Sequence, residues 1–109
     1  MDKRIKYLWL EALTSGEYEQ GKFQLKSENK FCCLGVLCDI HRKETGLGSW
    51  ERNLYSVNKK YSIFVLSNVV TKWAALDSSN PEIGDISLAT LNDSGLSFVD
   101  IAKEIEKSL

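Results

Sequence analysis

Three cysteines and the only histidine of this chain lie close together, at Cys32, Cys33, Cys38 and His41. Thiolate and imidazole groups are good zinc ligands, and the spacing of Cys38 and His41 would place both on one helical face. A structural zinc site needs further ligands, and no second pair of cysteines or histidines stands elsewhere in the sequence. We therefore expect packed, reduced thiols, with no metal site and no bound cofactor.

The same segment is a weak candidate for nucleophilic catalysis. A cysteine nucleophile needs partial exposure and a neighbouring base that lowers the pKa of its thiol, whereas Cys38 stands in a largely apolar run. A hydrolase acting on a nucleotide would need acid–base residues, and Asp39, His41 and Asp93 are the available candidates. They form no recognisable catalytic motif. The sequence therefore predicts no catalytic residue and favours a binding protein.

Polar and aromatic residues in three other places suit the recognition of a nucleotide-like ligand. In Gln20-Gly21-Lys22 the glycine lets a ligand approach the backbone, while the side chains can bond a base edge or a phosphate. The candidate ligand-binding residues are Gln20, Lys22, Trp50, Arg52, Asn92 and Asp93. Each place also has a structural alternative, because a tight turn, a half-buried hairpin aromatic and a helix cap use the same residue types.

The charge balance argues against binding to duplex nucleic acid. The chain has 14 basic and 15 acidic residues and a net charge of −1, whereas proteins that neutralise phosphates present a basic face. Residues 91–102 resemble a helix-turn-helix in their spacing, but the final helix mixes acidic and basic side chains on its polar face. We expect neither a DNA-reading helix nor duplex binding.

The elements that must position these residues follow from apolar periodicity and capping signals. Helices are expected over residues 2–15, from about 34 to 45, and at 67–74, 88–91 and 97–109. Alternation predicts a short strand at 21–26 within a first hairpin (18–31), and aromatics on both sides of Asn58-Lys59-Lys60 predict a second hairpin (50–65). The expected fold is α+β: one domain over residues 1–109, in which a small antiparallel sheet packs with four to five helices around one core.

The chain shows no pattern for export or for a membrane span. Its first residues lack the apolar stretch of a secretory signal. The longest apolar run, residues 32–38, is much shorter than the ~20 residues that cross a bilayer. The adjacent Cys32 and Cys33 are unsuited to a structural disulfide, which favours a reducing compartment. We expect a cytoplasmic protein with no membrane partner.

Three segments resemble a group of short, uncharacterised proteins from bacteriophages and prophages. They are Trp9–Gly21, the FCCLGVLCD segment at 31–39, and the LNDSGLSFVDIA segment at 91–102. The FCCLGVLCD segment is the most specific of the three, and the resemblance covers most of the chain apart from residues 44–66. A looser likeness joins the chain to an uncharacterised bacterial domain with a Gln-Gly step, although Leu91 stands where that domain has a tryptophan.

The resemblance implies a phage or prophage origin, and counter-defence is a frequent role of small phage proteins. The leading hypothesis is a sponge that binds and sequesters a nucleotide-derived immune messenger in the host bacterial cytoplasm without cleaving it. Pockets in such small proteins often straddle two subunits, so we also expect a homo-oligomer. The alternative is a protein–protein inhibitor that contacts a host factor through the aromatic hairpin. A small hydrolase acting on a nucleotide is a third hypothesis.

Overall fold

The computed structural model describes the whole chain, residues 1–109, as five helices and eight short strands. The helices are α1 (Lys3–Thr14), α2 (Cys33–Thr45), α3 (Asn68–Trp73), α4 (Leu88–Asp93) and α5 (Phe98–Ser108). The strands are β1 (Glu19–Gln20), β2 (Lys26–Ser27), β3 (Lys30–Phe31), β4 (Gly48–Glu51), β5 (Leu54–Val57), β6 (Lys60–Ser62), β7 (Glu82–Ile83) and β8 (Ile86–Ser87). The predicted α+β class is confirmed, but the strands form three separate sheets, with the orders β1-β3-β2, β4-β5-β6 and β7-β8.

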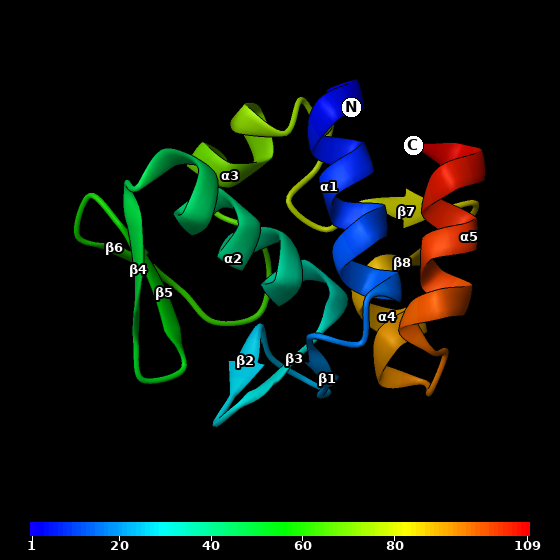
Figure 1. Ribbon diagram of the computed structural model, residues 1–109, viewed down its shortest axis with the longest axis horizontal. Helices are drawn as coiled ribbons and strands as arrows, with labels where there is room; N and C mark the ends of the chain where they lie inside the picture. The colour runs from blue at the N-terminus through cyan, green and yellow to red at the C-terminus, as the bar shows by residue number, and fades with distance from the viewer.

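The central element of the fold is α2 (Figure 1). Its N-cap is Cys32, whose sulfur accepts a hydrogen bond from the Gly35 N–H, and it ends at Gly46, where φ is 69°. Every residue from Cys33 to His41 is buried, because α1, α4 and β4 all pack against this helix. The predicted start near residue 34 and end near residue 45 are confirmed. None of the helices combines the length and the apolar content needed to cross a bilayer.

The helices α1 and α5 lie side by side and run in opposite directions, with the chain termini close together (Figure 1). The Met1 amino group lies 3.5 Å from the Leu109 carbonyl oxygen. The buried side chains of the two helices are Ile5, Trp9, Leu13, Phe98, Ile101, Ala102 and Ile105. The indole N–H of Trp9 also donates to the Cys33 carbonyl at 3.0 Å, which ties α1 to α2. All these residues belong to one cluster of 21 buried apolar residues.

The strands β4, β5 and β6 form an antiparallel meander at one end of the molecule (Figure 1). Asn58 and Lys59 make the β5–β6 turn with positive φ values of 52° and 63°, a combination that suits a two-residue hairpin. The turn predicted around these residues is confirmed. A further turn at Arg52-Asn53 separates β4 from β5 and was not expected, and residues 63–65 leave the sheet instead of extending it.

The hairpin predicted in the region 18–31 is confirmed at β2 and β3, which pair antiparallel across a turn at Glu28-Asn29, but the segment before β2 differs from its prediction. Residues 21–25 bend instead of forming a strand, and β3 pairs in parallel with β1 and antiparallel with β2. The cause is tertiary contact: the buried Leu25 donates its N–H to the Ile63 carbonyl at 2.7 Å and accepts from the Cys32 N–H at 3.1 Å. Because these bonds replace a regular ladder, the strand predicted at 21–26 is wrong.

Candidate functional site

A buried amide, that of Asn92 in α4, is the centre of a polar network between distant parts of the chain. Its Oδ1 accepts hydrogen bonds from Gln20 Nε2 at 3.0 Å and from the Cys33 N–H at 3.1 Å. Its Nδ2 donates to the Gly21 carbonyl at 2.8 Å and to Asp93 Oδ1 at 3.3 Å. The side chain is fully buried, and both donor hydrogens and both acceptor directions are in use.

The side chain of Gln20 makes three of its four possible hydrogen bonds inside the protein. Its Nε2 donates to the Leu96 carbonyl at 2.8 Å as well as to Asn92, and its Oε1 accepts from the Phe98 N–H at 3.2 Å. The two amides therefore fasten β1 to α2, α4 and the start of α5. Asn92 therefore has no free group to offer a ligand, and Gln20 retains only one acceptor direction on Oε1.

The outer end of this network holds an exposed phenyl ring. Asp93 Oδ1 accepts from the Phe23 N–H at 2.8 Å, and Phe23 has a φ of 73° with 71% of its surface exposed. A bulky side chain in the left-handed region is uncommon and strained. The neighbouring Lys22 is exposed, with its Nζ beside Gly95. The structure thus brings together Gln20, Lys22, Asn92 and Asp93.

The two remaining candidate residues lie elsewhere. The indole N–H of Trp50 donates to Asp39 Oδ1 at 3.0 Å, and its ring packs against Phe31 and Tyr55. Arg52 is exposed at the β4–β5 turn, with a φ of 59°. No hydrogen bond or aromatic contact joins either residue to the Asn92 network. The six candidates therefore divide between two places on the molecule.

A second polar cluster surrounds the buried carboxylate of Asp39 in α2. Asp39 accepts from the Tyr18 hydroxyl at 2.6 Å and from Arg42 Nε at 2.9 Å, in addition to Trp50. Burial acts to raise the pKa of Asp39, but the hydrogen bonds from Arg42, Tyr18 and Trp50 outweigh it, so this pKa is lowered. The carboxylate is therefore charged and links the α1–β1 loop, α2 and β4. Sequence reasoning missed this role of Asp39, because Tyr18 and Trp50, unlike Arg42, come from other elements of the chain.

Two basic side chains lie over the aromatic rings of this cluster. Lys43 Nζ donates to the Tyr18 hydroxyl at 3.1 Å, which raises the pKa of Lys43, while burial and the hydrogen bond to Asp39 raise the pKa of Tyr18. Tyr18 is therefore protonated and Lys43 charged at neutral pH. Lys26 Nζ lies 5.4 Å from the centre of the Trp50 ring and 5.7 Å from that of Phe31.

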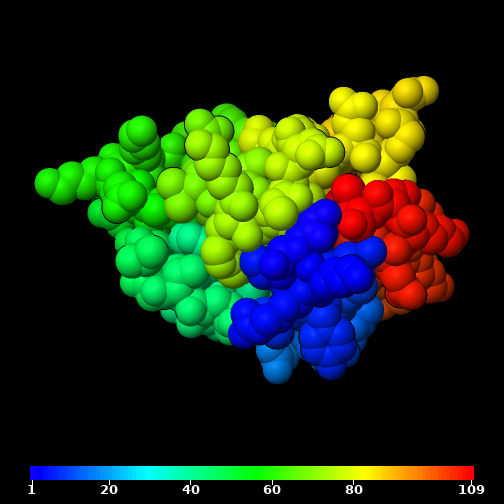
Figure 2. All heavy atoms as spheres, turned by 90° about the horizontal axis from the view of Figure 1, so that it is seen from above, coloured from blue at the N-terminus to red at the C-terminus, as the bar shows by residue number.

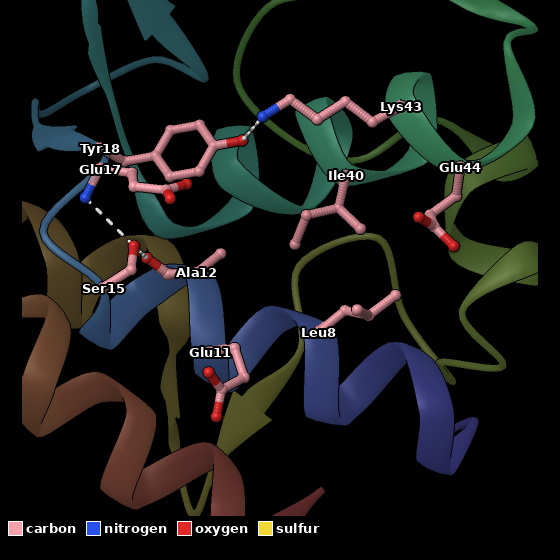
Figure 3. Close-up of a pocket in the computed structure, with 9 residues that line it drawn as sticks. All are labelled: Leu8, Glu11, Ala12, Ser15, Glu17, Tyr18, Ile40, Lys43 and Glu44. Atoms are coloured by element: carbon pink, nitrogen blue, oxygen red, sulfur yellow. Dashed lines mark hydrogen bonds between the residues drawn. The ribbon is translucent and has the colours of Figure 1, made fainter.

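A groove of about 260 Å³ opens beside Tyr18, between α1 and α2 (Figure 3). It is lined by Leu8, Glu11, Ala12, Ser15, Glu17, Tyr18, Ile40, Lys43 and Glu44. Three of these residues are acidic and one is basic, and Glu44 also pairs with Arg4. An excess of carboxylates repels phosphate groups, so this groove is a poor place for a nucleotide.

The cysteines and the histidine are buried in separate environments. Burial raises the pKa of Cys32 to about 11 and the pKa values of Cys33 and Cys38 well above the usual value, so the thiols are protonated. All three cysteines are free, as the sequence predicts. His41 Nδ1 lies 2.6 Å from the Tyr55 hydroxyl, and burial lowers the pKa of His41. No group of three or more His, Cys, Asp or Glu side chains is placed to hold a metal ion.

Exposed apolar residues gather in the sequence at and after β6, and another lies on the segment bonded to it. They are Phe23, Tyr61, Ile63, Phe64 and Val65, which we call the apolar strip, and Phe64 has 61% of its surface exposed. The hydrogen bond from the Leu25 N–H to the Ile63 carbonyl brings its two segments side by side. Within the aromatic hairpin of the sequence, Tyr55 and Val57 point into the core. Phe23 carried no signal in the sequence, because its exposure depends on the bond to Asp93.

These features define a small α+β domain with a buried polar network and an exposed apolar strip. A family described as Domain of unknown function (DUF8296) matches residues 1–109, and the chain belongs to this family. Comparison with curated proteins and with solved structures gave no match.

Proposed function

We propose that this protein acts by binding and blocking another protein through the apolar strip. The observation that carries the proposal is the exposure of two phenyl rings, a tyrosine and two aliphatic side chains on neighbouring segments. Soluble proteins rarely expose apolar side chains in a group unless the group binds something. Aromatic side chains are also the usual anchors of protein interfaces, because each buries a large apolar area at a small loss of conformational entropy.

The backbone of Phe23 supports the same proposal. A left-handed conformation costs about 1–2 kcal/mol for a residue with a Cβ atom. The hydrogen bond to Asp93 and the Asn92 network hold Phe23 in this conformation. A strained backbone at an exposed residue is a reason to propose a function for its side chain. In this proposal the Gln20–Asn92–Asp93 network acts by positioning Phe23, not by touching a ligand.

The resemblance to phage and prophage proteins supports a role in counter-defence, which we propose takes place in the cytoplasm of the host bacterium. The blocked partner is then a host protein, and the mode of action is binding without turnover. The surroundings of the acid–base candidates agree with a non-enzymatic role. Asp39 is paired with Arg42, His41 lies against Tyr55, and Asp93 accepts from a backbone N–H, so the three share no common site.

The experiment is a capture assay from host lysate with the wild-type chain and matched variants. We expect Phe64→Ser and Phe23→Gly to reduce capture of a specific host protein at least about tenfold, equivalent to ~1.4 kcal/mol. Ile86→Ser is the control, because Ile86 is an exposed apolar residue outside the strip. Equal capture by all four proteins, or no specific capture by the wild type, would contradict the proposal.

The same variants separate binding from folding. Glycine adopts positive φ without strain, so Phe23→Gly is expected to raise the free energy of unfolding by about 1 kcal/mol. Phe23→Ala removes the ring but keeps the Cβ atom, and we expect it to leave stability nearly unchanged. Urea denaturation of the wild type, Phe23→Gly and Phe23→Ala measures this difference in the free energy of unfolding. A marked loss of stability in Phe23→Gly would mean that the ring supports the fold instead of a partner.

Sequestration of a nucleotide-derived messenger is the second candidate function. The observation in its favour is the position of Lys26 over the Trp50 and Phe31 rings, with Arg42 and Lys43 nearby. Stacking faces with adjacent cations are what a nucleotide needs. Native mass spectrometry with cyclic and ADP-ribose-type nucleotides tests it, with Lys26→Gln as the variant that loses binding. No bound nucleotide would end this proposal, and a chemically altered one would favour a hydrolase.

A further inference from the structure

The two ends of the molecule carry opposite charge. Residues 20–72 contain nine basic and four acidic residues, whereas residues 73–109 contain two basic and seven acidic residues. Figure 2 shows the green residues of the meander at one end and the yellow and red residues of β7, β8 and α5 toward the other, whereas residues 20–23 are bonded to residues 92–98. The meander, residues 48–62, has three basic residues and one acidic residue, and residues 82–108 have two basic and six acidic residues, so the first is a positive end and the second a negative end.

Phe23 of the apolar strip is bonded through its N–H to Asp93, but the main segment of the strip, residues 61–65, belongs to the positive end. It begins directly after Lys59 and Lys60, which form the β5–β6 turn and the first residue of β6 and are both exposed. Neither lysine takes part in a salt bridge within the chain. A surface that fits the strip must therefore offer apolar contact together with carboxylates.

A groove with these properties lies between α1 and α5. It has a volume of about 480 Å³ and is lined by Tyr7, Leu10, Glu11, Thr14, Val99, Ala102, Lys103 and Glu106. Tyr7 and Val99 are exposed, so the groove presents apolar surface to solvent. The groove is lined by one lysine, Lys103. Its Nζ lies 3.7 Å from Asp100 Oδ1, so the charge of Lys103 is offset by that of Asp100. The carboxylates of Glu11 and Glu106 form no salt bridge, and Lys6 Nζ donates to the backbone carbonyl of Glu106 at 3.0 Å.

We propose that the apolar strip of one copy docks in the α1–α5 groove of a second copy, so that the protein self-associates head to tail. Charge complementarity selects this arrangement. Contact between two strips would bring Lys59 and Lys60 of both copies together, whereas contact between strip and groove brings these lysines to Glu11 and Glu106. A head-to-tail contact leaves one strip and one groove unoccupied in a dimer, so further copies add until a ring closes.

This arrangement regulates the proposed function. It rests on the proposed function in one respect, which is that the apolar strip is a contact surface. The second copy covers the strip until a partner protein competes for it. Since the contact combines apolar burial with opposed charges at an exposed rim, high salt weakens it by screening the charges. The concentration of the protein thus sets how much of the strip is free.

A pair of complementary variants tests the contact. Phe64→Glu places a carboxylate in the strip and leaves the groove intact, while Val99→Arg places a cation in the groove and leaves the strip intact. Each variant alone is expected to be monomeric by native mass spectrometry and light scattering, whereas the wild type forms oligomers that weaken at high salt. An equimolar mixture of the variants is expected to form a 1:1 dimer and nothing larger, because only one strip and one groove remain functional.

Three results would overturn the inference: a wild type that stays monomeric at high concentration, a Val99→Arg variant that still self-associates, or a mixture that stays monomeric. Far-UV circular dichroism checks that both variants are folded, and Ile86→Ser provides a folded control that should oligomerise like the wild type. The capture assay keeps the two proposals apart. Val99→Arg retains its strip, so it must still capture a host protein if the proposed function is right, whether or not self-association occurs.

Discussion

The amide of Asn92 illustrates how a polar residue can have a structural role that resembles a binding role in the sequence. Asn and Gln are suited to a ligand because each has donors and acceptors on a short side chain. The same property lets Asn92 join the Cys33 N–H, the Gly21 carbonyl and the Gln20 amide inside the protein. A buried donor or acceptor without a partner is costly, so these bonds are worth more than their number suggests.

Replacing Asn92 by alanine is therefore expected to destabilise the fold. The change leaves at least the buried Cys33 N–H and the Gly21 carbonyl without their partner, at a cost of about 2–4 kcal/mol. Urea denaturation measures it. Asn29→Ala is the matched control, because Asn29 is an exposed asparagine; its effect should stay within about 0.5 kcal/mol. Equal effects of the two changes would contradict the role of Asn92.

The buried His41 gives the stability a dependence on pH. Burial lowers the pKa of His41 below the usual value of 6.5, so the unfolded chain takes up a proton more readily than the folded one. The free energy of unfolding is then expected to fall as the pH decreases below about 6.5, until the lowered pKa is reached. Asp39, whose pKa is lowered from 3.8, adds stability that is lost only in more acidic solution.

The measurement is the urea midpoint between about pH 7 and pH 5, a range in which histidine titrates and most carboxyl groups do not. His41→Gln removes the titrating ring and is expected to flatten the dependence over this range. The same slope in both proteins would show that another group is responsible.

The helix α2 is held at close range to the segment before it. Gly35 lies one turn into α2, and a Cβ atom there would overlap the carbonyl oxygen of Leu25. The close contact lets the Leu25 carbonyl accept from the Cys32 N–H at the N-terminus of the helix. Helix propensity and packing therefore have opposite preferences at this position.

Gly35→Ala decides between them. In an isolated helix the change is stabilising by about 1 kcal/mol, whereas overlap with a backbone atom is expected to cost at least about 2 kcal/mol here. Gly84→Ala is the control: Gly84 has a φ of 64° and open space around its Cα, so only the backbone conformation is strained. We expect its cost to be about 1 kcal/mol by the same urea assay. A stabilised Gly35→Ala protein would refute the close packing.

The molecule as a whole is organised around a single cluster of buried apolar side chains, to which all five helices and the β4–β5–β6 sheet contribute. The exposed meander β4–β5–β6 joins this cluster through Tyr55 and Val57. The Asp39 carboxylate further connects the meander to α2 through Trp50. Elements that share one core lose their contacts together.

We therefore expect one cooperative unfolding transition. Tryptophan fluorescence, which reports on Trp9 in α1, Trp50 in β4 and Trp73 in α3, should coincide with far-UV circular dichroism. The comparison is made at several protein concentrations, because self-association shifts the midpoint without changing the agreement between the two probes. A separate early transition in the Trp50 signal would mean that the meander unfolds independently.

Much of this architecture was accessible from local patterns in the sequence. Helix α2 was predicted to within about two residues because its apolar run and Gly46 act over a few positions. The turn at Asn58-Lys59 was predicted for the same reason, since two-residue turns depend on the residues that form them. The apolar periodicity of α5 likewise reports its buried face directly. Capping, turn geometry and periodicity depend on residues a few positions apart, so they can be inferred from the sequence of one chain.

The uses of the polar residues were decided by tertiary structure. Gln20 bonds to Leu96, 76 residues away, and Asp39 bonds to Tyr18 and Trp50 from other elements. Such a side chain can use its hydrogen bonds inside the protein or keep them free for a ligand. Which of the two occurs depends on residues distant in sequence, and local sequence patterns do not identify these residues. The exposure of Phe23 and the bend at 21–25 have the same origin, because the partners that hold this segment are Asp93, Ile63 and Cys32. Contacts between residues distant in sequence form only when the whole chain packs, so they decide which surface remains for function.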